Sequence, residues 1–367
     1  MTRREFLAAG AGAAALSLLP RRALAQAGPA REMYDKAITI DTLTNDGPGV
    51  DARRALAAGL SAAVVDMLMY PRNFPNASRV LKEWKTAFEA PGSLLVNVRN
   101  AQGLRAAKAQ KKFGVILSSQ DGQILDSSTA SVNDYNLQNL KSFYDLGLRV
   151  LQLTHNEGNI LGDSFREKRN AGLTRLGEKV VAAMNQHGML IDLSHCGDQT
   201  TREAIDLSKK PCAITHAGCR ALYPTARNKP DELIRAVAEK GGYFGVFNMS
   251  LWLTARDTTS IDDVVAHIEH AVKVGGVEHV GFGSDGPVVE DTTPAADALK
   301  GQQSYAQRNL GLPGAERIPS HVTVAALNGP DRLWRLADAL VKRGHKTSDV
   351  EKIIGANFLR VFGEACG

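Results

Sequence analysis

Short apolar runs recur along the chain, and each ends in a small cluster of polar residues. Their length and composition are typical of buried strands. The eight runs are 37–42, 61–68, 113–120, 149–155, 189–195, 212–217, 243–249 and 279–285. Stretches with helical spacing or helix start and stop signals lie between several of them, at 131–146, 174–188 and 230–242. Eight strands that alternate with helices or loops predict a (β/α)8 barrel of the TIM type.

The strand and helix pattern extends over most of the 367 residues and favours a single domain. A (β/α)8 barrel takes about 250 residues and tolerates insertions. We therefore predict one catalytic-type barrel domain over 37–367, preceded by a linker at 26–36. Within that domain, 286–320 is rich in Gly, Pro and polar residues and predicts a long excursion after the eighth strand, whereas 322–364 is expected to be helical.

Residues 1–25 have the pattern of an export signal. Arg3 and Arg4 precede an apolar stretch at 7–19, and Ala23-Leu24-Ala25 has the small-x-small pattern of a cleavage site. The paired arginines favour a twin-arginine signal. An uncleaved membrane anchor is the alternative, but the apolar stretch is shorter than the roughly 17 to 25 residues that span a bilayer. We expect a periplasmic or secreted protein with no membrane span after cleavage.

Composition excludes some classes of function. The net charge of +5 comes largely from the first 25 residues, and aromatic residues make up only 6% of the chain. With no long run of Lys and Arg, nothing predicts a nucleic-acid surface. The four cysteines, Cys196, Cys212, Cys219 and Cys366, are too few for a disulfide scaffold and leave three full pairings open. Buried or bridged cysteines are favoured over metal ligands.

Candidate chemistry lies at the ends of the predicted strands, where barrels of this type carry their catalytic groups. His195 and His216 end the fifth and sixth runs, which are neighbours in a barrel, so both imidazoles can point into one mouth. Neutral imidazole is the commonest metal ligand, and zinc with two or three such ligands is a hydrolytic arrangement. Asp285 ends the eighth run and could bind the metal or shuttle a proton.

Two further residues favour a substrate with a polarised carbonyl and a carboxylate. His155 ends the fourth run and could polarise a carbonyl. Arg227 follows the sixth run and could bind a carboxylate through a bidentate fork. Each residue also has a structural alternative: a hydrogen-bonding histidine, a turn or cap for Asp285, and a salt-bridged or solvated side chain for Arg227.

In their local contexts these residues resemble the membrane (renal) dipeptidase family, zinc peptidases of the amidohydrolase superfamily. The resemblance extends from about residue 37 to 364 and rests on an ordered set of motifs at 146–155, 172–174, 188–195, 214–217, 226–231, 281–285 and 355–362. It implies a (β/α)8 barrel, a two-zinc centre, and hydrolysis of dipeptides with tolerance for a D residue on the C-terminal side. It further implies that His195 and His216 hold one zinc. His155 would contact the scissile carbonyl, Arg227 the substrate carboxylate, and Asp285 would shuttle the proton.

The chain departs from the family at the ligands of the other zinc. On the first strand the family has Asp-x-His-x-Asp, whereas this chain has Asp41-Thr42-Leu43-Thr44-Asn45. Where the family has a bridging Glu, this chain has Gln120, whose amide lacks the charge to hold two divalent ions. We therefore predict one zinc, with Gln120 or Asp285 as the third ligand. Acidic neighbours that could replace the lost ligands are Asp46, Asp66 and Asp121.

The sequence thus predicts an exported, metal-dependent hydrolase that resembles membrane dipeptidase and cleaves a dipeptide or another small carboxylate-bearing amide. Two alternatives remain open. One is a ligand-binding barrel without catalysis, and the other is an amidohydrolase that acts on a lactone or cyclic amide. We expect a small-molecule or dipeptide substrate as the partner and no nucleic acid. The protein could also form a homodimer.

Overall fold

The structure is a computed structural model that describes residues 28–67, 72–126, 134–256, 258–291 and 322–367. The predicted export signal and most of the predicted excursion after the eighth strand lie outside the described residues. Within the described part of the chain, no helix combines the length and the apolar character that a bilayer crossing requires.

Eight parallel strands form a nearly closed barrel, as the sequence predicted. Their order is β1 (Ile40–Asn45), β2 (Ala62–Asp66), β4 (Phe113–Ser119), β5 (Val150–Gln152), β6 (Leu190–Asp192), β7 (Ala213–Ala217), β8 (Tyr243–Val246) and β9 (Val280–Phe282). Backbone hydrogen bonds join the last strand to the first. The Asp285 N–H donates to the Leu43 carbonyl at 3.0 Å, and the Asn45 N–H donates to the Gly286 carbonyl at 3.1 Å.

One strand was not predicted from the sequence. Strand β3 (Leu95–Asn97) pairs with the first part of β4, and β5 pairs with the last two residues of β4. The apolar run around β3, 94–98, is shorter than any of the eight runs from which the strands were predicted. Because β3 lies at the start of β4, it does not alter the strand ends that carry the candidate site.

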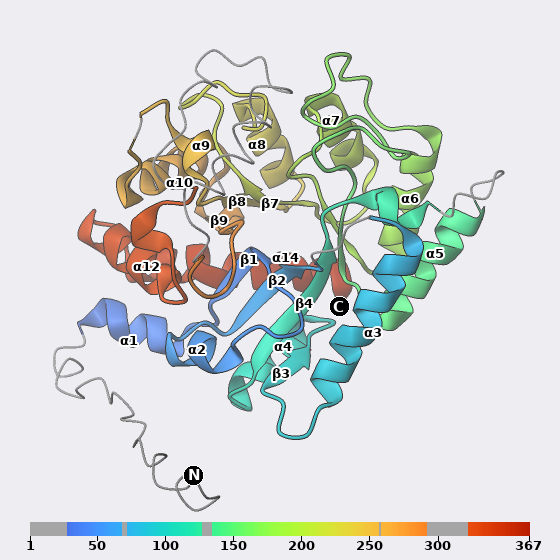
Figure 1. Ribbon diagram of the computed structural model, residues 1–367. Coiled ribbons are helices and arrows are strands. Elements are labelled where there is room, and N and C mark those ends of the chain that lie inside the picture. The colour runs from blue at the N-terminus through green and yellow to red at the C-terminus, as the bar shows by residue number, and fades with distance from the viewer. Residues whose placement is uncertain (1–27, 68–71, 127–133, 257, 292–321) are drawn as a thin grey trace, which may run out of the picture.

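Helices surround the strands (Figure 1). They are α1 (Pro29–Lys36), α2 (Ala52–Ala57), α3 (Phe74–Glu89), α4 (Ala101–Ala109), α5 (Asp134–Leu146), α6 (Arg175–His187), α7 (Asp198–Leu207), α8 (Asp231–Glu239), α9 (Ser250–Leu253), α10 (Ile261–Gly275), α12 (Arg332–Lys342), α13 (Thr347–Glu351) and α14 (Asn357–Cys366).

Local sequence signals explain several helix boundaries. The Thr174 hydroxyl accepts the Gly177 N–H at 3.0 Å and caps the start of α6, and Gly188 ends that helix at a φ of 75°. Both signals were predicted. The segment 26–36, predicted as a linker, contains α1, which contacts α12.

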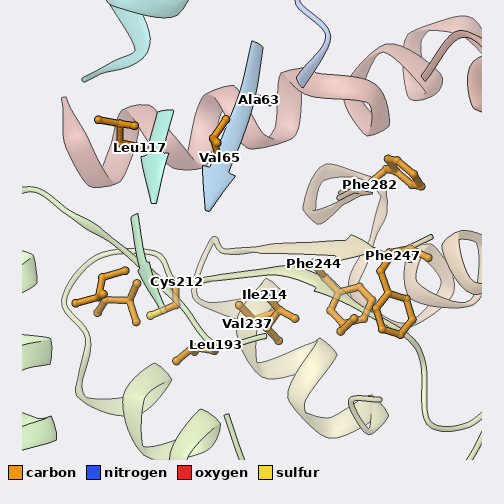
Figure 2. Close-up of a cluster of buried hydrophobic side chains, with 14 of the residues drawn as sticks. Ala63, Val65, Leu117, Leu193, Cys212, Ile214, Val237, Phe244, Phe247 and Phe282 are labelled. Carbon is orange, nitrogen blue, oxygen red and sulfur yellow. The ribbon is translucent and has the colours of Figure 1, made fainter. Parts of the chain in front are cut away.

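The buried core has two layers. In the outer layer, strand residues that point away from the barrel axis pack against helices, and Figure 2 shows Ile214 of β7 in one cluster with Val237 of α8. In the inner layer, residues near the strand starts, such as Ile40 and Tyr243, pack with Phe358 of α14. Helix α14 therefore covers the N-terminal end of the barrel, and the C-terminal strand ends remain available for a site.

The cysteines form no disulfide. All four lie in the described residues as free thiols, and Cys196, Cys212 and Cys219 are buried. Burial raises the pKa of the Cys212 thiol to about 12, so this group is neutral at physiological pH.

Candidate active site

A cavity of about 480 Å³ lies at the C-terminal ends of the strands. This volume is in the range of small-molecule sites. Five of the six predicted site residues line it: Gln120, His155, His195, Arg227 and Asp285. The sixth, His216, is fully buried and contacts His195. The structure therefore brings together side chains that are up to 165 positions apart in the sequence, between 120 and 285.

His195 and His216 form the centre of the site. Their Nε2 atoms lie 2.9 Å apart, and Asp285 Oδ1 lies 4.0 Å from His216 Nε2. One ligand atom from each of the three residues lies within 4.8 Å of the other two. Among the described residues, this is the only group of three or more His, Cys, Asp or Glu side chains that could hold a metal ion.

Hydrogen bonds to the other ring nitrogens fix the orientation of both imidazoles. His195 Nδ1 lies 3.1 Å from the Asn156 amide oxygen, which can only accept, so Nδ1 carries the proton. His216 Nδ1 lies 2.8 Å from the Thr215 hydroxyl, which in turn lies 2.6 Å from Asp192 Oδ2. The hydroxyl donates to the carboxylate and accepts from Nδ1. Both Nε2 atoms therefore present lone pairs to each other.

This donor set fits a divalent metal ion. Burial, and next the positive charge of Arg227, lower the pKa of His195 and His216 well below the usual range, so both rings are neutral at pH 7. Two lone pairs that face each other with no proton between them repel unless a cation binds both. Ligand nitrogens about 2.0 to 2.1 Å from a tetrahedral zinc lie roughly 3.3 Å apart, close to the separation in the structure. Hydrogen bonds to the ring nitrogen that faces away from the ion are also typical of metal-binding histidines.

Asp285 follows β9, and its backbone adopts an unfavourable conformation that a hydrogen bond stabilises. Its φ is 57°, in the left-handed region that few residues other than glycine adopt. The Asn45 side-chain amide donates to its carbonyl at 3.1 Å. Burial raises the pKa of the Asp285 carboxyl to about 6, and the charge of Arg227 opposes this shift. A carboxyl group that titrates near neutral pH is suited to accept and release a proton.

The positions at which this chain departs from the dipeptidase pattern differ in their surroundings. Leu43 is buried in the inner core layer and does not line the cavity. Asn45 and Gln120 do line it, and the Asn45 side-chain amide donates to the Asp285 carboxylate at 3.5 Å and favours its charged form. An amide that donates to the carboxylate presents a positive hydrogen, not a lone pair, at that point. These groups do not build a second ion site.

The acidic residues considered as replacements do not complete a second site either. Asp46 accepts a backbone N–H from the segment after β9 at 3.0 Å and does not line the cavity. Asp121 caps the short helix η2 (Gly122–Leu125) and also points elsewhere. Asp66 lines the cavity, but its two oxygens accept the Gln120 N–H at 3.0 Å and pair with Arg72 at 3.2 Å.

Arg227 is almost fully buried in the cavity wall. It donates to the carbonyls of Ser194 at 2.8 Å and His216 at 2.9 Å, and so connects the ends of β6 and β7. Its guanidinium carbon lies 5.8 Å and 5.2 Å from the ring centroids of Phe165 and Phe247. Burial lowers its pKa to about 10, so it keeps its charge at pH 7 and suits an anionic ligand group.

His155 and three unpredicted residues complete the site. The rings of His155 and His195 stack with centroids 4.5 Å apart, and burial, followed by the charges of Arg72 and Arg227, lowers the pKa of His155 well below its usual range. Three residues that orient the imidazoles of His195 and His216 were not predicted from the sequence: Asn156, Thr215 and Asp192. Asn156 directly follows His155, and Thr215 directly precedes His216. A polar residue beside a predicted histidine was therefore the signal that could have identified both.

The chain is similar in sequence to known dipeptidases. The sequence model of membrane dipeptidase, peptidase family M19, matches residues 58–298. Dipeptidase tcpJ of Claviceps purpurea is 30% identical over 229 residues, which are 61% of this chain and 46% of that protein. An uncharacterized dipeptidase of Schizosaccharomyces pombe is 35% identical over 227 residues, 61% of this chain and 48% of that protein. The match therefore spans about half the length of these curated relatives.

A solved structure has the same fold over nearly its whole length. The crystal structure of an amidohydrolase from Pseudomonas aeruginosa superimposes with a TM-score of 0.78 and 24% sequence identity. The similarity covers 92% of this chain and 99% of that chain. The barrel and its flanking helices are thus a shared architecture.

Proposed function

Because the chain belongs to the membrane dipeptidase family, peptidase family M19, we propose that it is a metal-dependent hydrolase that cleaves a dipeptide or another small amide bearing a carboxylate. The observation that carries the proposal is the pair of Nε2 atoms, 2.9 Å apart, in His195 and His216. Asp285 and Arg227 lie in the same cavity and supply a proton carrier and a positive charge. Together these groups support hydrolysis better than binding alone.

We propose that the site takes one divalent ion, zinc, held by His195, His216 and Asp285. When bound, such an ion polarises a carbonyl and lowers the pKa of water toward about 7. The amides of Asn45 and Gln120 and the buried Leu43 argue against a second ion. With one Lewis acid instead of two, we expect slower peptide cleavage than a two-metal site would give.

The chain's own residues supply the remaining steps. Arg227 binds the substrate carboxylate and fixes the position of the scissile bond. The neutral His155 ring, stacked on His195, donates a hydrogen bond to the carbonyl oxygen as negative charge develops on it. Asp285 accepts a proton from the attacking water and delivers it to the leaving amine.

Hydrolysis of a dipeptide panel by the full chain, with zinc added, tests this proposal. We expect release of both amino acids by the wild type, and loss of activity in His216→Ala because a metal ligand is removed. A protein that binds dipeptides without cleaving them at any zinc concentration would favour the ligand-binding alternative. A protein that binds neither zinc nor dipeptide would overturn the proposal altogether.

We also propose that residues 1–25 direct export of this activity, on the basis of Arg3, Arg4 and the apolar stretch that follows. Cell fractionation of the wild type and of an Arg3→Lys/Arg4→Lys variant tests this. We expect the wild type outside the cytoplasm and the variant retained inside it. Equal distribution of the two proteins would contradict a twin-arginine signal.

A further inference from the structure

One side of the cavity is apolar, and three side chains from separate segments build it. Phe165 comes from the connection after β5, Met249 follows β8, and Trp252 belongs to α9. Each has less than a tenth of its surface exposed, although all three line the cavity. We refer to Phe165, Met249 and Trp252 as the apolar wall.

Several contacts hold the apolar wall in place. The rings of Phe165 and Trp252 meet edge to face with centroids 6.3 Å apart. The Phe165 N–H donates to the His195 carbonyl at 2.9 Å, and the Asn228 amide donates to the Trp252 carbonyl at 2.8 Å. The wall is therefore preformed, and an apolar group that binds to it does not have to order it first.

The position of Phe165 relates the wall to the chemistry. Its ring centroid lies 5.8 Å from the guanidinium carbon of Arg227 and 5.7 Å from the ring centroid of His195. A substrate with its carboxylate on Arg227 and its scissile carbonyl near His195 would therefore lie close to the Phe165 ring. The carbon atom that bears the carboxylate then lies beside the apolar wall.

The other side of the cavity has the opposite character. Asn45, Asp66 and Gln120 line it from the ends of β1, β2 and β4. In the strand order β1 and β2 lie across the barrel from β6 and β7, whose ends Arg227 connects, and β4 lies across from β8, which Met249 follows. The polar and apolar halves thus receive different ends of one bound molecule.

From this arrangement we infer that the substrate is an amide whose carboxylate-bearing residue has an apolar side chain of about the size of leucine, which packs on Phe165, Met249 and Trp252. The inference rests on the proposed function for the placement of the carboxylate. A polar side chain of equal size would lose its water contacts at the wall, where the indole N–H of Trp252 is the one strong hydrogen-bonding group among the three side chains. We expect at least about a tenfold preference for the apolar side chain.

Two isosteric pairs of ligands test the inference. For cleavage, kcat/KM is compared for Ala-Leu and Ala-Asn, whose second residues differ in polarity but little in size. For binding without cleavage, calorimetry compares 4-methylpentanoate with succinamate, which are the corresponding carboxylates without the α-amino group. We expect the leucine-like member to be favoured at least about tenfold in both measurements. Equal binding of the two carboxylates, or binding of neither, would overturn the inference.

A matched pair of variants assigns the preference to the wall. Met249→Leu keeps an apolar side chain, whereas Met249→Gln introduces an amide of similar length. We expect the preference for 4-methylpentanoate over succinamate to persist in Met249→Leu and to fall several-fold in Met249→Gln. An unchanged ratio in Met249→Gln would contradict the inference. The binding measurement does not depend on cleavage. Failure to cleave any dipeptide would therefore count against the proposed function, while the binding of the two carboxylates would still test the role of the apolar wall.

Discussion

The side-chain amide of Asn45 donates a hydrogen bond to the backbone carbonyl of Asp285, 3.1 Å away, and joins the first strand of the barrel to the end of the last. The same amide favours the charged form of the Asp285 carboxylate. A carboxylate at position 45 would instead repel Asp285 and require a cation between the two. We therefore expect the amide at position 45 to disfavour a second ion and to form a hydrogen bond in its place.

Restoring the family's ligands should restore the second ion. In a triple variant, Leu43→His, Asn45→Asp and Gln120→Glu, we expect bound zinc to rise from one to two ions per chain, because carboxylates at positions 45 and 120 then line the cavity. Metal analysis after gel filtration measures the number of ions. Gln123→Glu, which adds one of these charges outside the cavity, should stay at one ion. A triple variant that also stays at one would show that the backbone geometry, and not the ligand identity, excludes the second ion.

The hydroxyl of Thr215 should contribute to metal affinity although it does not face the metal position. It accepts from His216 Nδ1 and donates to Asp192, so it keeps the Nε2 lone pair directed at the site. Loss of such an orienting group typically weakens metal binding by about 10- to 100-fold. We expect this in Thr215→Val, measured by competition with a chromophoric chelator, and recovery in Thr215→Ser. Wild-type affinity in Thr215→Val would rule out the orienting role.

Arg332 should be among the most important side chains for stability. It is buried, pairs with the fully buried Asp41 at 3.2 Å, and donates to Ser284 Oγ at 2.6 Å. Arg332→Met leaves the Asp41 charge unpaired, and we expect a loss of about 3 to 5 kcal/mol in the free energy of unfolding.

Chemical denaturation measures this loss. The exposed pair of Arg335 and Asp331 in the same region provides the control, since Arg335→Met should cost less than about 1 kcal/mol. Equal effects of the Arg332 and Arg335 variants would contradict the importance assigned to the buried pair.

His267 should make stability depend on pH. Its Nδ1 accepts the Cys219 N–H and its Nε2 donates to the Leu253 carbonyl, both at 2.9 Å, so only the neutral ring satisfies both bonds. Burial lowers its pKa in the folded state below 6.5, and the Leu253 carbonyl opposes this. Below pH 6.5 the unfolded state therefore binds more protons, and the stability contributed by the neutral ring is lost as the pH falls.

A comparison with His267→Asn isolates this group, because Asn keeps an acceptor but does not titrate. Relative to the variant, the wild type should lose up to about 1.4 kcal/mol of unfolding free energy per pH unit below 6.5. Denaturation at several pH values between 7.5 and 4.5 measures the difference. Parallel pH profiles for the two proteins would contradict the assignment.

The sequence predicted the features that depend on local patterns. Apolar runs such as 212–217 are strands because buried strands need continuous apolar residues, and their ends placed His195, His216 and Asp285 at one mouth. It did not predict β3, whose apolar run at 94–98 is shorter than the other eight runs, or helix α1 within the expected linker.

Features that depend on tertiary packing were also not predictable. Phe165 and Trp252 lie 87 positions apart in the sequence, and only the fold brings their rings together beside Arg227. The link from Asp192 through Thr215 to His216 likewise needs the pairing of β6 with β7. The strand ends therefore revealed which groups could react, but not which groups orient them or contact the substrate.

The number of zinc ions per chain tests the central claim most directly. The full chain is loaded with excess zinc, passed through gel filtration, and analysed for metal and protein, alongside a His195→Ala/His216→Ala variant. A single site on His195, His216 and Asp285 predicts about one ion per wild-type chain and none in the variant. Two ions per wild-type chain, or none, or one ion retained by the variant, would contradict it.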